Sequence, residues 1–77
     1  MPIKSTIFCP TFDVANKVYS EAVSNKVTKL KLSPITESKM IPYDWVVSFE
    51  CDTPGLANDI LEKIQDNYSS VKTEIES

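Results

Sequence analysis

The chain nearly repeats itself along its length. Each of five residues in the first half is identical to the residue 42 positions further on, and these pairs are Cys9 and Cys51, Thr11 and Thr53, Ala15 and Ala57, Asn16 and Asn58, and Asn25 and Asn67. The apolar residues around them also agree in kind, since Ile7 corresponds to Phe49 and Val18 to Ile60. Each copy therefore predicts the same succession of strand, helix and strand, which limits the chain to a few α+β topologies.

The first copy predicts a strand over residues 2–9, because its side chains alternate in character. The inner set of that strand is Ile3, Ser5, Ile7 and Cys9. Thr11 can cap a helix, since apolar residues then recur at three- and four-residue spacing. These apolar positions are Val14, Ala15, Val18, Ala22 and Val23. A second strand is expected over 27–33, with Leu30 and Leu32 facing inward.

The second copy predicts a strand over residues 44–52. Its inner set is Trp45, Val47, Phe49 and Cys51. Thr53 can cap the next helix, and Pro54 suits its first position because the missing N–H would be unpaired there anyway. The apolar stripe of this helix is Leu56, Ala57, Ile60, Leu61, Ile64 and Tyr68. The closing alternation over 71–76 predicts an edge strand.

These elements form two βαβ halves, at about 2–33 and 43–76, in a single domain of 77 residues. Crossover connections between parallel strands are right-handed, which leaves one simple closed arrangement. That arrangement is an α+β, ferredoxin-like βαββαβ fold. It has a four-stranded antiparallel sheet in the order 4-1-3-2 with both helices on one face.

Composition argues against several classes of function. The chain has no histidine and no arginine, so it lacks the commonest general base, the commonest metal ligand and the bidentate phosphate clamp. Its net charge of −3 also disfavours nucleic-acid binding, which relies on clustered basic residues. We therefore expect no enzymatic activity, no cofactor, no bound metal and no nucleic-acid partner.

The sequence has neither the basic and then apolar start of a signal peptide nor an apolar run of membrane-spanning length. These observations predict a cytoplasmic protein with no membrane partner.

Two cysteines, Cys9 and Cys51, invite comparison with a disulfide or a metal pair. In the predicted fold each ends a central strand, and these strands run antiparallel, so the thiols should lie about 15–20 Å apart. Two buried structural thiols are therefore favoured. The alternative is a reactive thiol, because each cysteine precedes a helix N-terminus that could lower its pKa.

The sharpest local motif is the turn Asp52-Thr53-Pro54-Gly55-Leu56. It resembles the Asp-x-Pro-Gly turn of ACT domains, which are ferredoxin-like regulatory modules that in many cases bind amino acids near the start of the following helix. In ACT domains the turn follows the first strand, whereas here it follows the third expected strand. The resemblance implies a ligand site at Asp52, Thr53, Gly55 and Leu56. The alternative interpretation is purely structural, a capped helix start.

The sheet face without helices is the other candidate site. It should expose Phe8 and Val46 as an apolar centre, with Ser48 and charged residues around them, as in a modest protein contact. The connection over 33–43 adds Met40, Ile41 and Tyr43, which could either dock a partner or fold back over the core.

The sequence therefore predicts a small non-enzymatic protein-binding module, a regulator or inhibitor of a larger protein, which could also pair with itself as a homodimer. The contact would use the open sheet face, the 33–43 connection or an edge strand. The alternative function is an ACT-like domain that senses a small metabolite.

Overall fold

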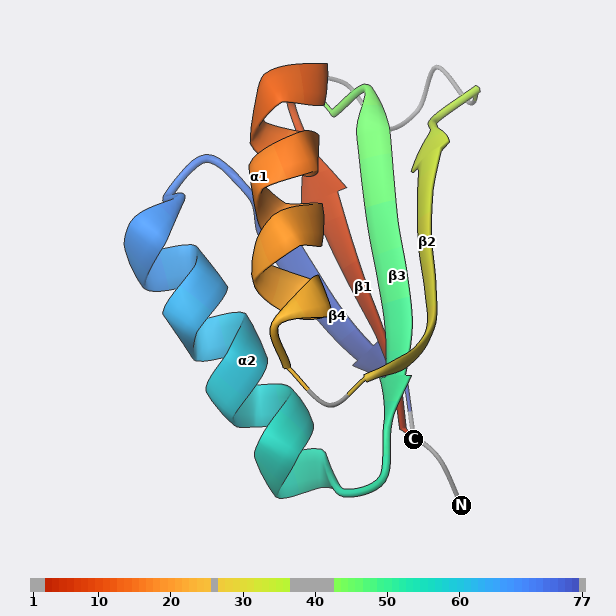
Figure 1. The fold of residues 1–77 in the computed structure, drawn as a ribbon. Helices are drawn as coiled ribbons and strands as arrows, with labels where there is room; N and C mark the ends of the chain where they lie inside the picture. Colours follow the sequence, from red (N-terminus) through yellow and green to blue (C-terminus); the bar gives the residue numbers. More distant parts are fainter. Residues whose placement is uncertain (1–2, 26, 37–42, 77) are drawn as a thin grey trace.

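The structure is a computed structural model that describes residues 3–25, 27–36 and 43–76. Figure 1 shows its six elements, which follow the predicted order along the chain. They are β1 (Ile3–Cys9), α1 (Phe12–Val23), β2 (Thr28–Pro34), β3 (Trp45–Cys51), α2 (Pro54–Asn67) and β4 (Lys72–Glu76). The strands form one sheet in the order β2-β3-β1-β4, and every neighbouring pair is antiparallel. The predicted fold is confirmed.

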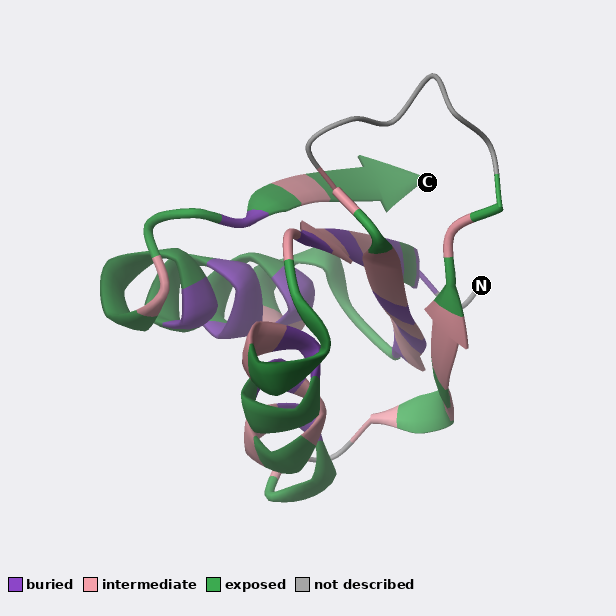
Figure 2. Cartoon of the chain, turned by 90° about the horizontal axis from the view of Figure 1, so that it is seen from above, coloured by how far each residue is buried: buried purple, intermediate pink, exposed green. Residues whose placement is uncertain are grey.

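The centre of the sheet is the pairing of β1 with β3, in which Ile7 lies opposite Val47 and Phe8 opposite Val46. Strand β4 adds to the outer side of β1, and β2 adds to the outer side of β3. Both helices lie on the same side of this sheet, and Figure 2 shows their buried residues turned toward it. Among the described residues, no helix lies on the other side of the sheet.

The two helices begin in the same way, as the repeat predicts. Thr11 and Thr53 both have extended backbones, and the hydroxyl of each accepts a hydrogen bond from the backbone N–H three residues later. Such caps satisfy one of the unpaired N–H groups that open every helix. Each central strand therefore leads through a capping threonine directly into its helix.

The core lies between the sheet and the helices. Strands β1 and β3 alternate between buried and less buried residues, which confirms the predicted inner sets, and Trp45 is the half-buried member that packs against the core. The largest fully buried side chain is Phe49, at the middle of the sheet. Ser5 is also fully buried, and its hydroxyl has no hydrogen-bond partner among the described residues. In the described part of the chain, the core is therefore apolar apart from Ser5.

Among the predicted core positions, Trp45 packs at the rim of the core, and Val23 is exposed, so the prediction for Val23 is wrong. Trp45 is only half-buried, because it lies at the first residue of β3, at the rim of the core, where its ring meets the exposed ring of Phe12 edge-on at 4.9 Å between centroids. Val23 is 59% exposed. It is the last residue of α1, one residue past Ala22 and so about 100° around the helix from the buried stripe.

Truncation of Phe49 and truncation of Trp45 should lower the free energy of unfolding by unequal amounts. Phe49→Ala removes a fully buried ring and should lower the free energy of unfolding by about 3–5 kcal/mol. Trp45→Ala should cost less, because the indole is only partly buried. Urea unfolding of both variants, followed by far-ultraviolet circular dichroism, measures the difference. An equal or larger loss for Trp45→Ala would contradict this description of the core.

Candidate functional site

The candidate site is the sheet face without helices, which we call the open face. Its side chains come from alternate positions of the four strands, and they are Lys4, Thr6, Phe8, Lys29, Lys31, Val46, Ser48, Glu50, Lys72 and Glu74. The strand register also brings Ser33 opposite Val46, and Glu76 opposite Lys4, onto this face. None of these residues is buried.

One end of the open face is apolar. Phe8 and Val46 lie directly opposite each other on the two central strands, and both are half-buried. The ring of Tyr43 lies 6.2 Å from that of Phe8, measured between centroids. The structure thus brings together four predicted contact residues, Phe8, Val46, Ser48 and Tyr43. The other two, Met40 and Ile41, lie outside the described residues.

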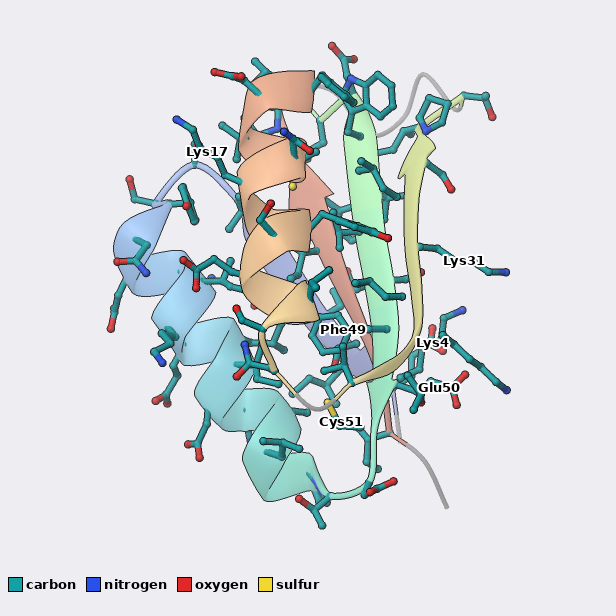
Figure 3. The ribbon with its side chains drawn as sticks, viewed as in Figure 1. Lys4, Lys17, Lys31, Phe49, Glu50 and Cys51 are labelled. Atoms are coloured by element: carbon teal, nitrogen blue, oxygen red, sulfur yellow. The ribbon has the colours of Figure 1, made fainter. Side chains whose placement is uncertain are left out.

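The other end of the open face is charged and hollowed. A hollow of about 110 Å³ is lined by Lys4, Lys29, Lys31, Ser48, Phe49 and Glu50. Figure 3 shows Lys4, Lys31 and Glu50 projecting from this part of the sheet, whereas Lys17 lies on the helix layer. Lysine thus gathers at one place on a chain whose net charge is −3.

A bulge in β2 contributes one of these lysines. Thr28 pairs with Glu50 and Lys31 with Ser48, so Lys29 and Leu30 together stand opposite Phe49. Lys29 has a φ of 53°, the left-handed region that a residue with a side chain enters only at an energetic cost. Its ammonium lies 3.5 Å from a carboxylate oxygen of Glu50. The bulge therefore carries Lys29 onto the open face while Leu30 packs against the core.

The turn at 52–56 acts structurally as a helix start. Thr53 is engaged in capping, since its hydroxyl accepts from the N–H of Leu56 at 3.2 Å. Gly55 does not have a positive φ, and a Cβ there would meet no atom within 4 Å. Neither the backbone conformation nor a close contact therefore requires glycine at this position. Asp52, Thr53 and Gly55 are exposed.

Leu56 alone of the four predicted ligand residues lines an open groove of about 410 Å³. Its other lining residues are Asn25, Asp59, Ile60, Lys63 and Asp66. The metabolite site stays a prediction.

Both cysteines are free and buried, at opposite ends of the central strand pair. Burial raises the pKa of the Cys9 thiol to about 11. Burial, and secondarily the charge of Asp52, raises the pKa of Cys51 as well. Helix N-termini therefore do not activate these thiols, and a reactive cysteine is not supported.

The described residues hold no group of three or more histidine, cysteine, aspartate or glutamate side chains that could bind a metal ion. In the same part of the chain, no helix is both long enough and apolar enough to cross a membrane.

Comparison with known proteins identifies similarity of fold only. No protein-family model matches the sequence, and no curated protein is significantly similar to it. Among solved structures, the chain is similar to a protein of Thermus thermophilus that is provisionally described as a PII-like signalling protein. The TM-score is 0.75 at 14% identity, with 97% of this chain and 83% of that chain covered.

A second solved structure, the protein PH0061, superimposes less well. Its TM-score is 0.50 at 13% identity, with 96% of this chain covered. The present chain spans only 49% of the length of PH0061. Together the two similarities place this chain among ferredoxin-like folds.

The buried Cys9 thiol should make stability depend on alkaline pH. Because the folded pKa is raised, the unfolded chain loses this proton near pH 9 while the folded chain keeps it until about pH 11. The stability contribution is complete below pH 9 and is lost as pH rises toward 11. Urea unfolding across this range should show a shallower decline for Cys9→Ala than for the native chain. Parallel declines would contradict the raised pKa.

Proposed function

We propose that this chain is a small non-enzymatic module that regulates another protein by binding it through the open face. The observation that carries the proposal is the uncovered side of the sheet, where Phe8, Val46 and Tyr43 form an apolar patch beside a charged end. The helices cover only the other side.

The layout of the patch suits a contact between proteins. Aromatic residues are enriched where interfaces bury their centre, and polar residues form the rim. Phe8 and Tyr43 provide aromatic surface. Thr6 and Ser48, which are small and polar, lie opposite each other on β1 and β3 beside the apolar patch. A sheet face that carries no helix can accommodate a partner without requiring a deep cavity.

The proposed lack of enzymatic activity is supported by composition. The whole sequence contains no histidine and no arginine, and both cysteine thiols stay protonated at neutral pH because burial raises their pKa. A regulatory role is supported by the fold, which is similar to that of a protein described as PII-like and signalling.

Affinity capture tests this function. Tagged native protein and a Phe8→Ala variant are each incubated with lysate of the source organism, and the retained proteins are identified by mass spectrometry. The native chain should retain a protein that Phe8→Ala loses at least about tenfold, because truncation of a central aromatic residue at an interface commonly costs over 1 kcal/mol.

The matched control is Phe12→Ala, the same truncation at an exposed ring on the helix side of the molecule. Thermal unfolding of each variant shows that it is folded at the temperature of capture. Retention that is equal for Phe8→Ala and the native chain, or that only Phe12→Ala abolishes, would contradict a contact through the open face.

A further inference from the structure

We propose that the open face docks a second copy of this chain, with the two sheets face to face about a two-fold axis that runs along the strands between β1 and β3. This inference rests on the proposed function, because it takes the open face to be a protein-contact surface and names its occupant. The observation behind it is the order of charges across the sheet.

The charges on the open face form rows that change sign across the strands. In one row the residues on β2, β3, β1 and β4 are Lys29, Glu50, Lys4 and Glu76. In the next row they are Lys31, Ser48, Thr6 and Glu74. The first row therefore alternates positive and negative, and the second is positive at β2, neutral at the centre and negative at β4.

A two-fold axis along the strands exchanges left and right within each row but keeps the rows level. It therefore places β2 of one copy over β4 of the other and β3 over β1. Lys31 then faces Glu74 of the second copy, and Lys29 faces Glu76. Glu50 faces Lys4 in the same way, so both charged rows are complementary to themselves, as an interface between identical surfaces requires.

The other in-plane axis has the opposite effect. A two-fold axis that runs across the strands through the row of Lys31 places each strand over its own copy, so Lys31 would face Lys31 and Glu74 would face Glu74. Juxtaposed like charges oppose association. The charge order therefore favours the axis along the strands over the axis across them.

The apolar row and the hollow agree with this arrangement. Phe8 and Val46 are opposite each other in the sheet, so the axis brings Phe8 of each copy over Val46 of the other. In this arrangement the hollow lined by Lys4, Lys29 and Lys31 of one copy receives the exposed carboxylates on β4 of the other copy. The glutamates that complement this lysine-rich hollow are therefore present on the chain itself.

The geometry leaves Lys31 and Glu74 available for pairing between copies, whereas Lys29 already pairs with Glu50 within the chain. Edge strands β2 and β4 are three strand spacings apart, about 14 Å, so Lys31 and Glu74 do not meet within one chain. The ion pair between Lys72 and Glu74 is 3.7 Å long, and about half of each side chain is exposed. Pairs of this kind contribute little and can rearrange. Stacked sheets keep their strands within about 30° of each other, a twist that long lysine and glutamate side chains can follow.

Charge reversal tests the arrangement. Sedimentation velocity of the purified chain over a concentration series should show a monomer–dimer equilibrium. Lys31→Glu and Glu74→Lys should each raise the dimer dissociation constant by about tenfold or more, since symmetry turns two attractive contacts into two repulsive ones.

Two combinations should restore association. An equimolar mixture of Lys31→Glu and Glu74→Lys regains opposite charges at both contacts, and so does the chain that carries both substitutions. Lys17→Glu and Glu62→Lys make the same charge changes at exposed positions of α1 and α2, and they should leave the dissociation constant unchanged.

Three results would overturn the proposal that a second copy occupies the open face. The chain could stay monomeric, the dissociation constant could be unchanged by the charge reversals, or the equimolar mixture could fail to restore association. The proposed function would survive any of these results if lysate capture returned a different protein in a Phe8-dependent manner. It would fail only if capture were also independent of Phe8.

Discussion

The antiparallel pairing of β1 with β3 is the constraint on which the other features of this fold depend. Their inner residues, including Ile7, Val47 and Phe49, are buried at the centre of the core. Each strand passes through a capping threonine into a helix, and both helices return over the same face. The second strand of each half can then only join at an outer edge, which gives the order β2-β3-β1-β4.

The same pairing determines what the open face displays. Because side chains alternate along a strand, burial of Ile7 and Val47 turns Phe8, Val46 and Ser48 to the uncovered side. The order of strands then separates most of the charges, with Lys29 and Lys31 on β2 at one edge and Glu74 and Glu76 on β4 at the other, where Lys72 also lies. A polar face with this asymmetry distinguishes between ways of stacking, which a uniformly apolar face would not do.

Much of the fold could be predicted from the sequence, because the alternation of apolar residues and the repeat of 42 residues can be seen without knowledge of long-range contacts. Alternation identified the inner residues of β1 and β3, and the matching threonines identified both helix starts. Alternation assigns a residue to a face but does not say how far the helices cover that face. Trp45 was therefore placed in the core although it lies at its rim.

The charged end of the open face was harder to predict. Alternation indicated that Leu30 and Leu32 face inward, but the meeting of Lys29 and Lys31 with Lys4 depends on strand order and register. The bulge at Lys29 and Leu30 gave no sequence signal, because a bulge residue in the left-handed region is usually glycine and here it is lysine. The predicted turn at Asp52 is present as a helix cap, and its ligand-binding role remains a prediction.

The most direct test of contact between two copies through the open face is the two-dimensional amide NMR spectrum of the native chain, recorded as its concentration is raised. Association of two open faces predicts resonance shifts at Thr6, Phe8, Val46 and Ser48, with the exposed positions of α1 and α2 unchanged. Shifts confined to the helices, or a spectrum that does not change with concentration, would contradict the docking of a second copy on the open face.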